Sequence, residues 1–291
     1  MTWKRVATAA VLIPLAVGLV LWGSTAWVAL TTALVMLLAL FEYFSLGEAI
    51  GHCAYRFWTA ACALMLVYVQ WVAATERIYE LTGGLALHRE IARFGSELDN
   101  VAGVFFLFVL GVTALTLWTK RPLVEALPAA GISASGLTLV AFPLTFAVRL
   151  HAVPREGPQL LLFALVITWV GDSAAYFVGR AIGRHSLAPH LSPKKTWEGS
   201  AASLAGSLLV AILFARFVNV PLPHLLGMAG FGNLAGQAGD LLESAYKRSA
   251  GVKDSGGLLP GHGGMLDRID ALILTIPVVW YYWVLVYSPG T

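Results

Sequence analysis

Residues 26–46 read AWVALTTALVMLLALFEYFSL, an apolar stretch in which Glu42 is the single charged side chain. An apolar run of about 18 or more residues is long enough for a helix to cross a bilayer, because each residue adds about 1.5 Å. Similar runs occupy residues 6–23, 57–74, 101–118, 132–149, 159–182, 200–217, 221–242 and 269–287. The pattern predicts an all-α, polytopic integral membrane protein with about nine transmembrane helices.

The composition supports this fold class. Of the 291 residues, 58% are hydrophobic and 12% are charged, whereas a soluble domain usually has about 25% charged residues. The longest polar gap, 75–100, is too short to build a core of its own, and the sequence leaves its role open. The net charge of +3 indicates membrane topology and contact with anionic lipid, and we expect no nucleic-acid partner.

The distribution of basic residues predicts the orientation of the chain. If the N-terminus lies inside, inside segments carry 13 of the 19 Lys and Arg residues, as expected for cytoplasmic loops. Two polar loops, 184–199 and 243–266, then fall on the same side. We therefore expect an active site facing the cytoplasm in a bacterial-type inner membrane. We divide the chain into N-terminal helices of unassigned role, 1–130, and C-terminal helices with catalytic loops, 131–291.

Three carboxylates lie within the apolar segments, namely Glu42, Asp172 and Asp240. A charge at membrane depth costs several kcal/mol and persists where it faces a cavity, a partner or an ion. Asp172 and Asp240 each precede a basic loop on the same side, which favours a functional role. For Glu42, a helix-end carboxylate paired with a basic side chain explains the sequence equally well.

Residues 192–199 read SPKKTWEG. Ser192 and the proline after it predict a turn, and Thr196 is suited to cap the helix that follows. A helix N-terminus beside Lys194 and Lys195 forms an anion site. Two lysines alone would suffice to anchor a loop at the membrane, but the whole string favours phosphate binding.

Residues 244–270 read SAYKRSAGVKDSGGLLPGHGGMLDRID and carry the densest polar pattern. Their glycines let a backbone approach phosphate closely, and their basic residues supply charge for a polyphosphate. Asp267 and Asp270 are three residues apart at an expected helix start and so share a face. Carboxylates beside phosphate suit Mg²⁺. His262 lies between glycines and is equally suited to bind phosphate, to act as an acid or to fill a turn.

Residues 244–270 resemble the signature of the phosphatidate cytidylyltransferase (CDP-diacylglycerol synthase) family, S-x-x-K-R, K-D, H-G-G and D-R-x-D at fixed spacing. Residues 192–199 are similar to a second hallmark of this family, and the segment that ends D-x-x-A-Y from Asp172 is similar to a third. Tyr246 departs from the usual aliphatic residue or Phe. The first 130 residues resemble the family more weakly.

The resemblance implies a reaction in which CTP and phosphatidate in the bilayer give CDP-diacylglycerol and pyrophosphate. It implies Mg²⁺ as cofactor, with a second, monovalent cation left open, and metal ligands drawn from Asp172, Asp240 and Asp267. It implies catalytic roles for Asp240, Lys253, Asp254, His262 and Asp267. It also implies substrate contacts from Asp172, Ser192, Lys194, Lys195, Thr196, Ser244, Lys247, Arg248, Gly263, Gly264 and Arg268.

Two alternatives stay open at this point. One is a CTP-dependent transferase that acts on another lipid phosphate or on a polyprenol. The other is an ion-coupled transporter, in which intramembrane aspartates would line the ion path; that architecture predicts inverted repeats, and the sequence has none. A homodimer is a further expectation for a polytopic enzyme of this kind.

Overall fold

The computed structural model describes residues 2–82, 97–120, 122–257 and 263–287, and helices dominate, as predicted. The α-helices are α1 (Thr2–Trp22), α2 (Thr25–Ala49), α3 (Arg56–Thr82), α5 (Glu97–Trp118), α6 (Ala126–Ser135), α7 (Phe142–His151), α8 (Gly157–Ile182), α9 (Trp197–Phe214), α10 (Leu222–Ser249), α11 (Leu266–Ile269) and α12 (Leu272–Tyr282). Short helical segments of other pitch are η1 (Leu123–Glu125), η2 (Gly136–Ala141) and η3 (Trp283–Tyr287).

Seven segments are long and apolar enough to cross a membrane: Thr25–Ala49, Arg56–Thr75, Asn100–Trp118, Leu123–His151, Gly157–Ile182, Trp197–Phe214 and Leu266–Tyr287. The other two expected spans are also helical. The side chains of α1 are described from Ala10 onward, and this part, Ala10–Trp22, is apolar. The helix α10 contains Asn233 and Gln237, which lower its hydropathy. The all-α membrane architecture is thus confirmed, and the count of nine spans is not.

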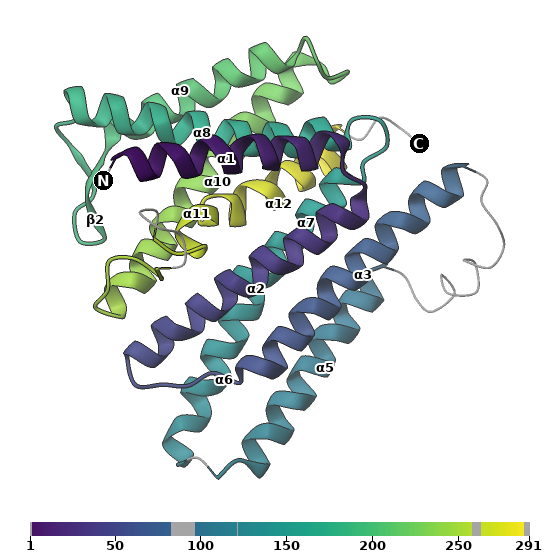
Figure 1. The fold of residues 1–291 in the computed structure, drawn as a ribbon, viewed down its shortest axis with the longest axis vertical. Helices are drawn as coiled ribbons and strands as arrows, with labels where there is room; N and C mark the ends of the chain where they lie inside the picture. Colours follow the sequence, from purple (N-terminus) through teal and green to yellow (C-terminus); the bar gives the residue numbers. More distant parts are fainter. Residues whose placement is uncertain (1, 83–96, 121, 258–262, 288–291) are drawn as a thin grey trace.

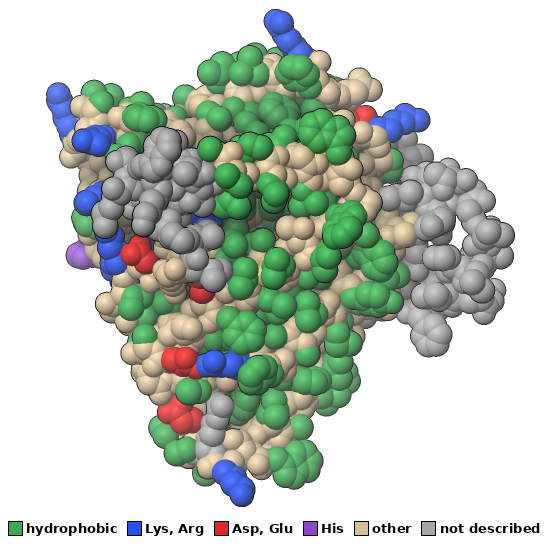
Figure 2. All heavy atoms as spheres, viewed as in Figure 1, with side chains coloured by type: hydrophobic (Ala, Val, Ile, Leu, Met, Phe, Trp, Pro, Cys, Tyr) green, Lys and Arg blue, Asp and Glu red, His purple; other side chains and the backbone are tan. Residues whose placement is uncertain are grey.

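The outer surface of the bundle is rich in apolar side chains. Phe57, Phe106, Leu117 and Phe217 are each at least 65% exposed. Figure 2 shows hydrophobic side chains over much of one face, with charged side chains gathered toward its margins. Such a surface would be unfavourable in water and is suited to lipid.

The helices share one hydrophobic core across the chain. In Figure 1, α2, α3 and α5 run obliquely below a layer formed by α1, α8 and α9. The helices α2 and α3 pack on α7, and α10 packs between α9 and α12. Leu40 and Phe44 of α2 are buried in the same core as Phe163 and Met228. The N-terminal helices therefore contact the C-terminal ones directly.

A small antiparallel hairpin, β1 (Ser186–Ala188) and β2 (Ser192–Thr196), joins α8 to α9. It corrects the expected turn at Ser192, because the turn lies at residues 189–191 and Ser192 pairs with Ala188. A two-stranded ribbon leaves one side of each strand unpaired, so Pro193 without an N–H is tolerated there.

The polar loops meet at one end of the bundle, as the sequence predicted. The start of α1, the hairpin and the ends of α8 and α10 all lie toward the same side in Figure 1. Nε of Arg248, near the end of α10, donates to the carbonyl of Leu191 in the hairpin turn at 3.3 Å.

Candidate active site

A cavity of about 280 Å³ opens where α8, α9, α10 and β2 meet. Close helix contact shapes its wall, since a side chain at Gly199 of α9 would press against the carbonyl of Ala175 in α8. Its lining combines charged groups with apolar ones: Asp172, Ala175, Tyr176, Leu187, Lys194, Lys195, Thr196, Gly199, Ser200, Ser203, Gln237 and Asp240.

The hairpin brings two lysines to this cavity. Nζ of Lys195 lies 2.5 Å from Oδ2 of Asp240 on α10, and Lys194 is exposed beside it. The predicted cap is confirmed, because the Gly199 amide donates to Oγ1 of Thr196 at 3.1 Å. Ser192 lies at the start of β2 and is not among the residues of the cavity wall.

Three carboxylates form a compact cluster beside the cavity. Oxygens of Asp240, Glu243 and Asp270 lie within 4.8 Å of one another. Asp240 and Glu243 share a face of α10 because they are three residues apart. Asp270 reaches them because Gly239 has no side chain, and a Cβ there would meet the Asp270 carbonyl oxygen at 2.5 Å. A set of carboxylate oxygens suits a hard cation such as Mg²⁺.

The electrostatics of this cluster leave negative charge in excess. Among the described residues, two lysines form ion pairs with it, Lys195 with Asp240 and Lys247 with Glu243. Glu243 is 4% exposed. It lies directly after the expected transmembrane segment 221–242. Burial raises the pKa of its carboxyl to about 7, although Lys247 opposes this shift. A bound cation would offset the repulsion between these carboxylates.

Asp172 of α8 lies on the cavity wall. It is a fourth carboxylate near the cluster of Asp240, Glu243 and Asp270. It lies within electrostatic range of Asp240, Lys195 and Arg268. Asp172 and Asp240, the two aspartates in apolar segments to which the sequence assigned a function, are thus brought together by the fold.

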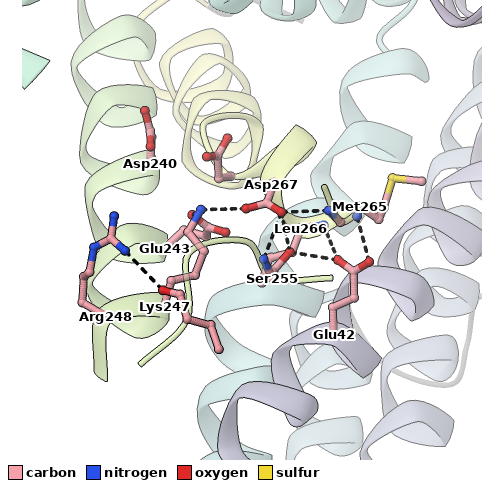
Figure 3. A network of polar contacts seen from close by, with 12 residues as sticks. Glu42, Asp240, Glu243, Lys247, Arg248, Ser255, Met265, Leu266 and Asp267 are labelled. Carbon is pink, nitrogen blue, oxygen red and sulfur yellow. Dashed lines mark hydrogen bonds and ion pairs between the residues drawn. The ribbon is translucent and has the colours of Figure 1, made fainter. Parts of the chain in front are cut away.

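Asp267 lies in a different setting from Asp270. Its Oδ1 accepts from Nζ of Lys247 at 2.6 Å, and its Oδ2 accepts from the amides of Ser255 and Gly264 and from Oγ of Ser255 (Figure 3). A side chain at Gly263, where φ is +78°, would meet Oδ2 of Asp267 at 2.7 Å. Asp267 therefore holds the loop and Lys247, and its predicted role as a metal ligand stays a prediction.

The loop after α10 carries further predicted site residues. Lys253 and Asp254 are exposed there, and Asp254 lies close to Gly263. Arg268 is also exposed, on α11. Its electrostatic influence reaches Asp172. His262 lies outside the described residues, so its role stays a prediction.

Two predicted substrate contacts sit near the end of α10. Ser244 is buried in the helix. Arg248 donates to the carbonyls of Leu191 and Val252, each at 3.3 Å, and so ties α10 to the hairpin. Their roles as substrate contacts stay predictions.

The fold also contains site residues that the sequence did not single out. Glu243 was overlooked although its spacing from Asp240 was a usable signal. Ser200 donates to Gln237 at 2.5 Å, Gln237 donates to Asn233 at 2.7 Å, and Asn233 donates to Ser203 at 2.9 Å. Hydroxyls and amides of this kind are common between packed membrane helices, so their residue types alone did not indicate a cavity.

Comparison with known proteins decides the family. The model of the cytidylyltransferase family matches residues 3–286. The chain belongs to this cytidylyltransferase family. A curated phosphatidate cytidylyltransferase of Synechocystis sp. is 36% identical over 98% of this chain and 97% of its own. Those of Haemophilus influenzae and Bacillus subtilis are each 40% identical, over 57% and 47% of this chain and 59% and 51% of theirs.

Membership of the cytidylyltransferase family confirms the resemblance seen in residues 244–270. It makes this protein a transferase, and the transporter alternative has no support from the comparisons. The match begins at residue 3, so it includes the N-terminal helices whose own motifs resembled the family only weakly.

Proposed function

We propose that this cytidylyltransferase transfers the cytidylyl group of CTP to phosphatidate, giving CDP-diacylglycerol and pyrophosphate. The observation that carries the proposal is the acidic cluster of Asp240, Glu243 and Asp270 directly beside a cavity lined by Lys194 and Lys195. The names of the similar proteins from Synechocystis sp. and Haemophilus influenzae support the same reaction.

The proposed reaction is a displacement at phosphorus. An oxygen of the lipid phosphate attacks the α-phosphorus of CTP. A new P–O bond forms, the bond from the α-phosphorus to the oxygen that bridges to the β-phosphorus breaks, and pyrophosphate leaves. The second pKa of a phosphate monoester is about 6, so the nucleophile is largely dianionic at neutral pH and needs no general base. Charge neutralisation and in-line placement then dominate catalysis.

The cavity suits the lipid headgroup in this scheme. Lys194 and Lys195 would neutralise a phosphate there. Tyr176 and Trp197 are 58% and 60% exposed near the same end of the helices, and aromatic rings of this kind favour the membrane interface. Phosphatidate would thus present its phosphate at the cavity while its acyl chains stay among the helices and lipid.

We propose that Asp240, Glu243 and Asp270 hold Mg²⁺, with Asp172 close to the same centre. When bound, the ion would neutralise and orient phosphate oxygens of the nucleotide. Lys253 and Arg268 are exposed, Arg268 lies within electrostatic range of Asp172, and both are suited to contact the triphosphate. A second, monovalent cation and a homodimer stay predictions.

The charge bias of the loops supports a location in a bacterial-type inner membrane with this end facing the cytoplasm. That side would supply both CTP and Mg²⁺. The hairpin, which carries Lys194 and Lys195, and the loop after α10, which carries Lys253, both fall on this side in that orientation.

The test is transfer of label by purified protein in detergent with Mg²⁺ and phosphatidate. Label from α-labelled CTP should move into the lipid phase, and label from γ-labelled CTP should not. Chelation by EDTA should abolish transfer, and added Mg²⁺ should restore it. Transfer of γ-label would indicate a lipid kinase. Transfer only to a polyprenol phosphate or an ether-linked lipid in a parallel panel would move the substrate away from phosphatidate.

A further inference from the structure

Glu42 of α2 reaches into the loop that carries the signature motif. Oε1 of its carboxylate accepts the Met265 amide at 2.9 Å. Oε2 accepts a hydrogen bond from the Leu266 amide at 2.8 Å and lies 3.1 Å from Oγ of Ser255, whose one hydroxyl proton is shared between Glu42 and Asp267. Figure 3 shows the carboxylate of Glu42 facing these donors across the gap between α2 and the start of α11. A residue of the N-terminal helices therefore completes a hydrogen-bond network of the C-terminal site.

Two glycines of the signature make room for this carboxylate. A Cβ at Gly256 would lie 2.6 Å from Oε1 of Glu42, and a Cβ at Gly264 would collide with Oε2 of Glu42 and with Oγ of Ser255. From the sequence, these glycines were expected to let the backbone approach phosphate closely. In the structure the carboxylate of Glu42 occupies the space beside them.

Glu42 connects to the acidic cluster through a short chain of contacts. Oγ of Ser255 lies 3.0 Å from Oδ2 of Asp267, and Oδ1 of Asp267 lies 2.6 Å from Nζ of Lys247. Lys247 forms an ion pair with Glu243, which is a member of the cluster. A displacement of the loop at residues 264–267 would therefore shift Lys247 and, with it, the charge balance of the proposed metal centre.

The other acidic residue near the end of α2 behaves differently. Glu48 forms an ion pair with Arg56 and is about one third exposed. Within the described residues Glu42 has no such basic partner, and its hydrogen bonds come from Ser255, Met265 and Leu266. From the sequence, pairing with a basic side chain at a helix end explained Glu42 equally well. In the structure that explanation holds for Glu48 and not for Glu42.

We propose that Glu42 is a positioning residue of the active site. It holds residues 264–267 in place and so orients Asp267, Lys247 and the acidic cluster, although it touches neither substrate. This role rests on the proposed cytidylyl transfer. It gives the N-terminal helices a part in catalysis, because the site is incomplete without a side chain from α2.

The central experiment compares Glu42→Gln with Glu48→Gln, two isosteric changes that each remove one charge from α2. Loss of a residue that orients a metal ligand through hydrogen bonds typically lowers metal affinity or activity by about 10- to 100-fold. We expect Glu42→Gln to lower kcat by that factor and to raise the Mg²⁺ concentration for half-maximal rate. KM for CTP and phosphatidate should stay within about threefold, since the substrate contacts remain. Glu48→Gln should keep wild-type values.

A double-mutant cycle with Ser255→Ala tests the path of the effect. Ser255→Ala cuts the link between Glu42 and Asp267 without changing charge, so it should lower kcat with the same small change in KM. If the two residues act as one unit, the double variant loses little beyond Glu42→Gln alone. Wild-type kcat in Glu42→Gln, a change confined to KM, or fully additive losses would overturn the proposal. If Glu42→Gln does not fold, the kcat and KM of Ser255→Ala by themselves test the proposal.

Failure of the proposed function would be recognised separately. In that case wild type and Glu48→Gln both form no CDP-diacylglycerol. Amide hydrogen exchange then tests whether Glu42 holds residues 264–267 in place. Faster exchange at Met265 and Leu266 in Glu42→Gln than in Glu48→Gln would support the positioning role, and equal exchange would refute it.

Discussion

Two groups of carboxylates lie on either side of Lys247, and they are built in opposite ways. Glu42 and Asp267 face amide and hydroxyl donors of Ser255, Gly264, Met265 and Leu266, so their oxygens are satisfied by the protein. Asp240, Glu243 and Asp270 face one another. The first arrangement resembles structural hydrogen bonding, in which each charged acceptor has several donors. The second concentrates negative charge and suits a bound cation.

The comparison separates residues that the signature places side by side. Asp267 and Asp270 are one helical turn apart, yet Asp267 belongs to the first group and Asp270 to the second. Lys247 joins the two groups through its ion pairs with Asp267 and Glu243. Removing a carboxylate should accordingly have different consequences on the two sides.

The largest expected effect is on the cation-binding side. Asp240→Asn removes a carboxylate from the cluster and the partner of Lys195. Loss of one electrostatic element of a transition-state site costs about 100- to 1,000-fold in kcat. We expect at least this loss in cytidylyl transfer, with the thermal transition little changed. Glu156→Gln, at the opposite end of α8, is the control and should keep full activity. Full activity in Asp240→Asn would remove the cluster from the mechanism.

The next largest effect distinguishes Asp270 from Asp267 by metal affinity. Asp270→Asn should weaken Mn²⁺ or Mg²⁺ binding by more than the about 10- to 100-fold typical of an outer partner, because it removes a direct ligand. Asp267→Asn should stay within that range. Titration of Mn²⁺ followed by electron paramagnetic resonance measures both. The reverse order would restore Asp267 as the ligand expected from sequence.

A smaller effect concerns the two hairpin lysines. Lys195 contacts Asp240 at 2.5 Å, whereas Lys194 is exposed. Hydrogen bonds to charged groups contribute about 1.5–3 kcal/mol, so Lys195→Ala should lower kcat/KM by about 10- to 100-fold and by more than Lys194→Ala. Lys195→Arg keeps the charge and should recover part of the activity. Equal losses in the two alanine variants would mean that the ion pair with Asp240 does not matter.

The smallest effect is expected at Thr196. Its side chain caps α9 through the Gly199 amide, and loss of a threonine cap costs about 1 kcal/mol of stability. Thr196→Ala should lower the stability by that amount and leave KM for both substrates unchanged, whereas Thr196→Ser should preserve the cap. A raised KM with unchanged stability would support the substrate contact that the family resemblance implies.

Much of the fold could be predicted because lipid imposes a simple rule on sequence. Long apolar runs must form helices that satisfy their own backbone, and seven of the nine expected segments have the required length and hydropathy. Of the two others, α10 carries Asn233, Gln237 and Asp240, which lower its hydropathy. In α1 the described part, Ala10–Trp22, is apolar. The hairpin was overlooked because strands of three and five residues give too little pattern to recognise.

The candidate site was predicted less completely. The signature pointed to Lys247 and Asp267, and the apolar segment before it pointed to Asp240; the structure places these residues close together. Their roles could not be assigned, because hydrogen-bond partners come from loops and helices distant in sequence. Glu42 is more than 200 positions from the amides that it accepts, so nothing local to α2 revealed its partners.

The sequence by itself determined the membrane environment, the helical class and the family, since these depend on composition and on a dense local motif. Only the tertiary structure decided which carboxylates face donors and which face one another. That distinction arises from packing. Gly239 lets Asp270 approach α10, and Gly264 lets Glu42 enter the loop. Both contacts require space between elements far apart in the chain, and a linear pattern does not encode that space locally.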